Sequence, residues 1–306
     1  MIETSQLLLF ISADLVGSTS IKSTQVNIEE DRSWIGYFKK FYLDLPFIVN
    51  ENLKENNLKI DIWKFNGDEI LFKAVINRIN DIKVIIGRYI ESVREFQEKN
   101  SQENSYIIKT TIWTAGFPVI NKEVTPLLRD ENSNNKDEIT NPYQDYIGPS
   151  IDAGFRLTKF ADPNKIVLSI ELAYIVAKQF PEDFKIFYSG NEILKGILKE
   201  RPYPIFFLST PDKTEEIRNK LIGAGSKDSS IVTQYIKSYI HSIKDPFLIV
   251  LPYLISSEES FGEIHPIHQQ FLDRNKRRDE TMLSDPDDIK NTKPIDDLPQ
   301  KVKTLK

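Results

Sequence analysis

The feature that most constrains the fold is a run of five consecutive apolar residues near the start of the chain, Leu7 to Ile11. A short continuous apolar run of this kind is typical of a β-strand that is covered on both faces. Such a strand belongs in the interior of a sheet with other structure packed on each side. The pattern indicates that the strand ends at Asp14, so a carboxylate is expected at its carboxyl end.

Helix and strand patterns follow this run in a definite order. Apolar residues that recur at intervals of three and four predict helices, and alternation with polar residues predicts half-buried strands. We expect a helix over 29–53, bent or interrupted near Pro46, and then a strand in which Leu58, Ile60 and Ile62 point inward. A second strand resumes at 70–72. A helix with Asn80 as its N-cap and a strand over 106–117 follow.

Asn66-Gly67 separates the second and third strand patterns. Both residues tolerate positive φ, so the pair predicts a tight hairpin with Asp68 at or beside its tip. The resulting order of strand, helix, strand, strand, helix, strand predicts an α+β fold built on a ferredoxin-like βαββαβ unit. Unrelated functions share this fold, so function has to be inferred from particular residues.

The rest of the chain divides by composition. Residues 122–143 are largely polar and are expected to be disordered or to form a flap. A helix is expected over 149–161, and strands over 165–171, 185–189 and 203–209. The boundaries we expect are a domain over 1–211, a mostly helical C-terminal extension over 212–273, and a polar, disordered tail over 274–306. Within the extension, His265-Pro-Ile-His268 is expected to form a surface loop and not a metal site.

Composition excludes several classes of function. The chain has no cysteine, which removes disulfides, thiolate metal sites and a cysteine nucleophile. A net charge of −5 argues against binding to nucleic acid or to anionic lipid. The longest apolar stretch, 246–255, is far shorter than the roughly 18 residues of a membrane span, and no secretory signal is evident. We therefore expect a cytoplasmic protein that contacts neither a membrane nor nucleic acid.

Two segments place carboxylates where hard metal ions could bind. Asp14 ends the first strand and is followed by a Gly17-Ser18-Thr19 turn, an arrangement suited to Mg²⁺ or Mn²⁺ beside phosphate oxygens; helix capping by Asp14 is an equally open interpretation. Asp68 would lie on the adjacent strand pair, where two carboxylates can hold two metal ions for attack on a phosphoryl group. Ordinary turn chemistry is the alternative for Asp68.

A third segment places Asp152 and Arg156 four residues apart on one helix. Residues with this spacing share a helix face. A guanidinium there could stabilise negative charge that develops on a phosphate. The alternative is a simple surface ion pair.

The three segments, in this order and with strands between them, resemble the class III nucleotide cyclases over about residues 5–210. Asp14 matches that family's Asp-Ile-x-Gly-Ser/Phe-Thr turn, and Asp68 matches its Lys-x-x-Gly-Asp segment. The resemblance implies a metal site at Asp14, Leu15 and Asp68, substrate contacts from Ser18, Thr19, Lys64, Asp145 and Lys195, and a transition-state role for Arg156. It also implies a homodimer with active sites at the interface and two Mn²⁺ or Mg²⁺ ions.

A narrower resemblance is to the pyrimidine cyclases of bacterial Pycsar antiphage systems. It rests on Trp34 with the aromatic residues that follow it, on Trp113-Thr-Ala-Gly-Phe-Pro118, and on Gly148-Pro-Ser-Ile-Asp-Ala-Gly-Phe-Arg156. Asp152 stands where class III cyclases usually have Asn, and the narrower family is expected to have Asp there. This resemblance implies synthesis of cyclic UMP or cyclic CMP as a second messenger in antiviral defence, with a separate effector that responds to the product.

The identity of the base remains open at this point. Lys64 paired with Asp145 is the class III combination associated with adenine, so adenylate cyclase is the first alternative. A pyrimidine is smaller and would need an aromatic side chain to fill the pocket, for which Tyr42 is the candidate; a core position is the other interpretation of Tyr42. A catalytically silent nucleotide-binding regulator is the alternative outside enzymes.

Overall fold

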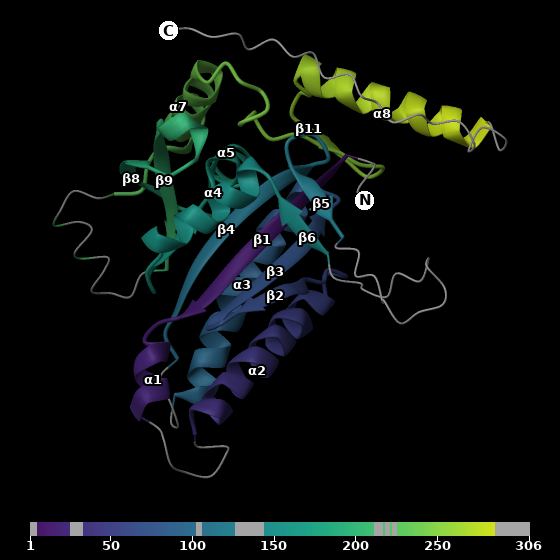
Figure 1. Ribbon diagram of the computed structural model, residues 1–306. Helices are drawn as coiled ribbons and strands as arrows, with labels where there is room; N and C mark the ends of the chain where they lie inside the picture. Colours follow the sequence, from purple (N-terminus) through teal and green to yellow (C-terminus); the bar gives the residue numbers. More distant parts are fainter. Residues whose placement is uncertain are drawn as a thin grey trace, which may run out of the picture.

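The computed structural model describes residues 5–24, 33–101, 106–125, 144–210, 217, 221 and 225–284 (Figure 1). The strands are β1 (Gln6–Leu15), β2 (Asp61–Asn66), β3 (Glu69–Ile76), β4 (Ile108–Phe117), β5 (Lys122–Val124), β6 (Asp145–Ile147), β7 (Lys165–Leu168), β8 (Ile186–Ile193), β9 (Pro202–Ser209), β10 (Leu254–Ile255) and β11 (Ser260–Phe261). The helices are α1 (Ser18–Thr24), α2 (Trp34–Lys54), α3 (Ile79–Asn100), α4 (Pro149–Leu157), α5 (Ile170–Gln179), α7 (Ser229–Ser242) and α8 (Pro266–Ser284).

Seven of these strands form one central sheet in the order β2-β3-β1-β4-β7-β9-β8. The β4–β7 pair is parallel, and the other neighbouring pairs are antiparallel. The part formed by β2, β3, β1 and β4, with α2 and α3 as the crossovers, has the βαββαβ order (Figure 1). The α+β, ferredoxin-like prediction is therefore confirmed.

Strand β1 lies inside the sheet and is covered on both faces, as its apolar run predicts. Leu7, Leu9 and Ile11 belong to the larger core, which α2 and α3 complete. Leu8 and Phe10 belong to a second, largely aromatic core on the opposite face. Alternate residues of one strand thus face two separate cores, which explains why the run has no polar member.

The second core is built around two tryptophans. The Phe10 ring lies 5.5 Å from that of Trp113 and 5.2 Å from that of Trp63. Trp63 is buried whereas Ile62 is exposed, so the expected inward position of Ile62 is wrong. The β2–β3 register shifts between Ile62 and Lys64, and this bulge changes which side chains of β2 face the sheet interior.

Helix α4 covers the second core at very short range. A Cβ atom placed on Gly154 would lie 2.4 Å from atoms of the buried Trp113 ring, which is closer than Cβ atoms approach other heavy atoms. Only a residue without a side chain therefore allows this approach. The position of α4 on the sheet depends on this contact between glycine and the indole ring.

Two expected features of the helices differ from the structure. Pro46 lies within a continuous α2, so the helix is not interrupted there, and the Asn50 amide donates to the Pro46 carbonyl at 3.2 Å. Helix α3 begins at Ile79 because the buried carboxylate of Asp81 accepts the N–H of Arg78 at 2.9 Å, so Asn80 is not the N-cap.

The strand expected over 165–171 ends at Leu168. The hydroxyl of Ser169 accepts the N–H of Leu172 at 3.3 Å and caps α5, which places Glu171 in the first turn of a helix. An apolar run of this length does not distinguish a strand from a buried helix.

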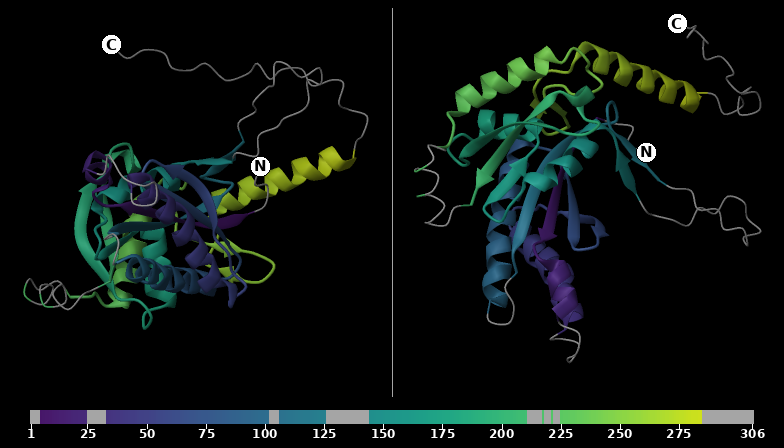
Figure 2. Two further views of the ribbon diagram at one scale, coloured as in Figure 1. Left: turned by 90° about the horizontal axis from the view of Figure 1, so that it is seen from below. Right: turned by 60° about the vertical axis from the view of Figure 1, so that its left-hand side comes forward.

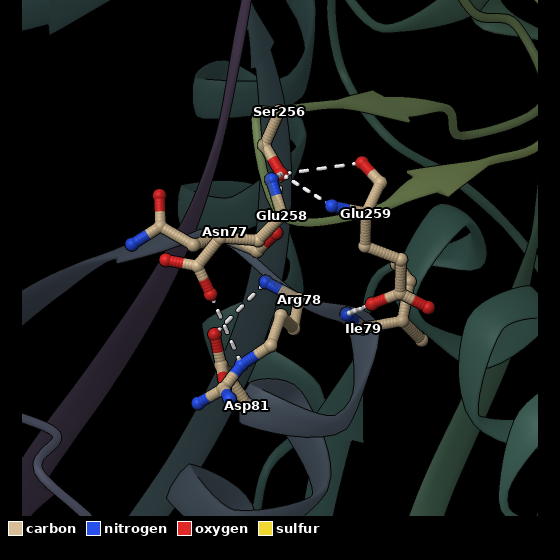
Figure 3. Close-up of polar contacts among 7 residues, drawn as sticks. All are labelled: Asn77, Arg78, Ile79, Asp81, Ser256, Glu258 and Glu259. Atoms are coloured by element: carbon tan, nitrogen blue, oxygen red, sulfur yellow. Dashed lines mark hydrogen bonds and ion pairs between the residues drawn. The ribbon is translucent and has the colours of Figure 1, made fainter.

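The C-terminal extension is bound to the main domain by a short hairpin, β10–β11. The Glu259 carboxylate accepts the N–H of Ile79, the first residue of α3, at 2.7 Å, and the Ser256 hydroxyl donates to the Asn77 carbonyl at 2.6 Å (Figure 3). The Arg78 guanidinium forms an ion pair with the Glu258 carboxylate, at 3.4 Å from Nε to Oε2, and a second ion pair with Asp81. We call this set of contacts the clasp. It joins segments about 180 residues apart and places a negative charge at the amino end of α3.

Helix α8 leads away from the sheet beyond the clasp (Figure 2). It continues to Ser284, so the boundary expected at 274 falls inside a helix. The remaining tail and most of the polar segment 122–143 lie outside the described residues, except that 122–124 form β5 and pair with β6. Among the described helices, none has the length and hydropathy of a membrane span.

We predict that Gly154→Ala destabilises the protein by about 1–3 kcal/mol, because the new methyl group must displace either α4 or the Trp113 ring. The matched control is Gly87→Ala in α3, where nothing lies within 4 Å of the added Cβ and a gain of about 0.5–1 kcal/mol is expected. Urea unfolding followed by tryptophan fluorescence measures both changes. Equal stabilities of the two variants would contradict the proposed contact.

Candidate functional site

A cleft of about 420 Å³ opens where β1 ends. Asp14 pairs in register with Glu69 at the start of β3, and the N–H of Leu15 donates to the carbonyl of Asp68 at 3.1 Å. The buried strand and the hairpin therefore bring Asp14 and Asp68 to the same place, as the two motifs predict. The cleft is lined by Asp14, Leu15, Val16, Gly17, Ser18, Thr19, Asp68, Lys109, Ala161, Asp162 and Pro163.

The Asp14 carboxylate has a cationic partner that the sequence did not reveal. Lys109 is opposite Asp14 in the β1–β4 register, and its ammonium nitrogen lies 2.7 Å from Asp14 Oδ2. Burial raises the pKa of Asp14, the hydrogen bond and charge of Lys109 oppose that rise, and the charges of Asp68 and Glu69 add to it. Asp14 therefore occupies a crowded negative site that is partly neutralised by a lysine.

Ser18 and Thr19 begin α1 at the edge of this cleft. Ser18 is buried, and its hydroxyl donates to Oδ2 of Asp68. Thr19 is exposed. The position of Ser18 makes it a residue that orients Asp68, whereas Thr19 is open to a ligand in the cleft.

The donor atoms in the cleft fit a hard divalent cation. Carboxylate oxygens from Asp14 and Asp68 are the ligand type that Mg²⁺ and Mn²⁺ prefer, and Asp14 already accepts a cation, the ammonium of Lys109. Over the described ranges, no group of three or more His, Asp or Glu side chains is arranged to hold a metal. A site with two carboxylates is of the kind that relies on substrate phosphates for further ligands.

Lys64 and Asp145 form a second site on the face of the sheet that carries the aromatic core. Lys64 Nζ lies 3.0 Å from Asp145 Oδ1, and it also lies 4.2 Å from the centroid of the Trp63 ring. Asp145 Oδ1 accepts the N–H of Tyr146 at 2.9 Å, which fixes the carboxylate. The structure thus brings together the two residues expected to contact the base.

Tyr42 reaches from α2 to the hairpin. Its hydroxyl donates to the carbonyl of Gly67, the residue before Asp68, and its ring centroid lies 4.8 Å from that of Phe65. Burial, and then the charge of Asp68, raise the pKa of Tyr42, so its hydroxyl keeps its proton. Tyr42 is partly buried against the larger core, so it combines a packing role with a place beside the carboxylate hairpin.

Arg156, Asp152 and Lys195 are exposed, and none contacts Asp14 or Asp68 within the described chain. Asp152 and Arg156 lie one turn apart on α4, but no ion pair between them is present in the described part of the structure. Lys195 lies in a turn after β8. One copy of the chain therefore assembles the Asp14–Asp68 cleft and the Lys64–Asp145 pair, and leaves Arg156 and Lys195 separate from the cleft.

Glu171 is a buried carboxyl group beneath α4 that the sequence pattern did not identify. The Ser150 hydroxyl in the first turn of α4 lies 3.5 Å from Glu171 Oε1. Burial raises the pKa of Glu171 to about 7. Hydrogen bonds with Ser169, Ser150 and Tyr203 act in the opposite direction and lower this pKa. Glu171 links the first turn of α5 to the helix that carries Arg156.

His268 is the second buried titratable group near α4. It is only 1% exposed and lies in α8, so the expected surface loop is wrong for His268, whereas His265 is exposed. His268 Nε2 lies 2.7 Å from the Pro246 carbonyl, and Nδ1 lies 3.3 Å from the Tyr253 hydroxyl. Burial lowers the pKa of His268, which favours the neutral ring. A histidine that bonds to its own extension in this way is a packing residue and not a metal ligand.

Comparison with known proteins gives structural neighbours alone. Neither a family description nor a curated protein matches the chain. The adenylyl cyclase CyaB from P. aeruginosa aligns with a TM-score of 0.48 and 16% identity, over 69% of this chain and 97% of that one. The guanylyl cyclase Cya2 has a TM-score of 0.46 and 13% identity, over 69% and 95%.

Another neighbour, an adenylate/guanylate cyclase/hydrolase from Silicibacter pomeroyi, has a TM-score of 0.43 and 13% identity, over 68% of this chain and 99% of that one. Similarities at this level do not assign an activity. The function proposed below therefore rests on the residues of this chain.

We predict that stability decreases with pH because of Glu171. The pKa of Glu171 in the folded chain, about 7, lies above the ordinary 4.5, so the folded state binds this proton more tightly than the unfolded state does. The stabilisation that results is present at low pH and is lost as the pH rises through 7. Between pH 5 and pH 8, the wild-type protein should lose up to about 3 kcal/mol relative to Glu171→Gln.

Urea unfolding at several pH values measures this difference. The exposed Glu51→Gln variant is the control and should follow the wild-type curve. Parallel pH curves for wild type and Glu171→Gln would show that Glu171 is not the titrating group.

Proposed function

We propose that this chain is a nucleotide cyclase that converts UTP or CTP into the 3′,5′-cyclic monophosphate and pyrophosphate. The observation that carries the proposal is the meeting of Asp14 and Asp68, from a buried strand and an adjacent hairpin, in one cleft with exposed Thr19. Two carboxylates on adjacent strands suit the binding of two divalent ions to a triphosphate. The motif resemblance to class III cyclases gives the same assignment.

The residues of the chain then have definite roles in the reaction. Two Mg²⁺ or Mn²⁺ ions held by Asp14, Leu15 and Asp68 would lower the pKa of the ribose 3′-hydroxyl and neutralise the triphosphate. Ser18 orients Asp68 through its hydroxyl. The 3′ oxygen attacks the α-phosphorus in line, the bond to the β-phosphate breaks, and pyrophosphate leaves without a covalent enzyme intermediate.

We infer that the complete site needs two copies of the chain. Arg156 is exposed on α4 and does not contact the Asp14–Asp68 cleft of its own copy. In a symmetric homodimer, Arg156 of one copy can reach the cleft of the other and stabilise charge on the phosphoryl oxygens. Lys195, Lys64 and Asp145 would contact the substrate in the same composite site, and Asp152 would assist Arg156.

The preference for a pyrimidine rests on the narrower motif resemblance. Tyr42, the residue expected to contact the smaller base, bonds through its hydroxyl to the Gly67 carbonyl and packs its ring against Phe65, beside the hairpin that carries Asp68. The narrower motif resemblance, which includes Asp152, supports cyclic UMP or cyclic CMP as a messenger in antiphage defence, read by a separate effector protein. We expect such an enzyme to act in the cytoplasm.

Adenylate cyclase is the second candidate, and one contact favours it. Lys64 and Asp145 are paired at 3.0 Å, and this lysine and aspartate combination is the one associated with adenine in the resembling family. The two candidates differ in their product and not in the chemistry at the α-phosphorus. Product analysis therefore separates them.

The first prediction of this proposal concerns the product. We expect purified protein with Mn²⁺ and equimolar ATP, GTP, UTP and CTP to form mainly cyclic UMP or cyclic CMP, identified by mass spectrometry. Asp14→Asn and Asp68→Asn should each abolish turnover, because the metal site loses a charged ligand, whereas the exposed Asp44→Asn should retain it.

Three results would overturn parts of this proposal. Cyclic AMP as the main product would establish the adenylate alternative and remove the support for a defence role. Full turnover by Asp68→Asn would remove the metal assignment. Metal-dependent nucleotide binding without turnover in the wild-type protein would indicate a silent regulator.

The second prediction concerns the composite site. Asp68→Asn and Arg156→Ala should each be inactive alone, and mixed dimers purified through both tags should recover about half of the wild-type activity, because each contains one intact site and one site with both substitutions. Two differently tagged variants, co-purified after mixing, provide the material. Recovery of no activity from verified mixed dimers would place Arg156 in the cleft of its own copy or outside catalysis.

A further inference from the structure

A second cleft, of about 580 Å³, lies between the main domain and the C-terminal extension. Its lining residues come from α5 of the main domain, from α7, from the segment 246–252 and from the start of α8. Figure 1 shows where these helices lie. Its size is within the range of small-molecule sites. None of the residues assigned to the cyclase reaction lines it.

The rim of this cleft is positively charged. Lys178, Lys237 and Lys244 line it together with one carboxylate, Glu263, whereas the whole chain has a net charge of −5. In the described part of the chain, the side-chain ammonium groups of Lys237 and Lys244 make neither a hydrogen bond nor an ion pair. The rim therefore concentrates uncompensated cations on an otherwise acidic protein, and such a field attracts anions.

Lys178 is held in a defined position by aromatic rings. Its ammonium lies 4.9 Å from the centroid of Phe261 in β11 and 5.6 Å from that of Tyr174 in α5. These cation–π contacts hold the charge at the junction between the two parts of the chain. An anion bound there would contact both the main domain and the extension.

The floor of the cleft is apolar. The floor is lined by Ile240 in α7, by Ile243 at the C-terminal end of α7, and by Ile249 in the following segment. Each of these side chains is less than 10% exposed. A free inorganic anion would gain nothing from such a surface, whereas the hydrocarbon or ring portion of an organic anion would be removed from water there.

We propose that this cleft binds a small organic anion, with its negative group on Lys178, Lys237 and Lys244 and its apolar or aromatic portion on the isoleucine floor. The shared chemistry is that of a carboxylate or phosphate attached to a compact apolar or planar group, as in a fatty acid or a nucleoside monophosphate. The proposal is independent of the cyclase assignment, because it uses none of the same residues. Occupation of the cleft would hold the extension against α5.

The test uses 8-anilinonaphthalene-1-sulfonate, a fluorescent anion with an aromatic body, titrated into the full-length protein. We expect one saturable site whose affinity falls at least tenfold in Lys237→Gln/Lys244→Gln and falls with added salt, because the rim charges are exposed and screened. The matched control is Lys54→Gln/Lys99→Gln, which removes two exposed lysines at the far ends of α2 and α3 and should leave the affinity unchanged.

Competition and unfolding measurements complete the experiment. Displacement of the dye by decanoate indicates a fatty-acid-like ligand, displacement by UMP indicates a nucleotide-like one, and displacement by neither overturns the proposal. Equal dye affinity in the two double variants also overturns it, because binding would then be due to apolar surface alone. Far-UV circular dichroism and melting temperature confirm that both variants are folded, and the dye should raise the melting temperature of the wild type and the control only.

Discussion

The burial of β1 on both faces is the constraint on which the rest of the structure depends. Residues 6–15 are hydrogen-bonded in register to β3 on one side and β4 on the other, and their side chains enter two separate cores. Asp14 cannot shift along the sheet without moving apolar residues of both cores into the wrong place. The carboxylate is therefore held in position by packing several residues away from it. This is the rigid support that a ligand-binding group on a sheet edge requires.

The electrostatics of the cleft follow from the same registers. Strand pairing places Glu69 on one side of Asp14 and Lys109 on the other, and Asp68 follows from the hairpin. Without a cation, three carboxylates would repel one another, and the ammonium of Lys109 at 2.7 Å relieves part of that repulsion. A divalent ion entering the cleft would compete with Lys109 for the Asp14 carboxylate.

The sequence allows the fold to be predicted where information is local. The apolar run of β1, the Asn66-Gly67 turn and the positions of Asp14 and Asp68 at the ends of strands each depend on a few adjacent residues. The role of Lys109 is not predictable from local sequence, because it depends on the β1–β4 register, which no local pattern specifies. The apolar run around Glu171 predicts a strand, because the cap at Ser169 is hidden within that run. The burial of His268 depends on Pro246 and Tyr253, whose approach is a tertiary effect.

The clasp has a consequence for the order in which the molecule forms. Helix α3 belongs to the first third of the chain, yet its first N–H is bonded by Glu259, about 180 residues later. During synthesis, the βαββαβ part can emerge and pack before Glu259 has been added to the chain. The N–H of the first residue of α3 therefore lacks this acceptor until the extension has left the ribosome. Contacts of such sequence separation form late because they carry the entropy of a long loop. The clasp therefore cannot form until the chain has been synthesised past residue 259.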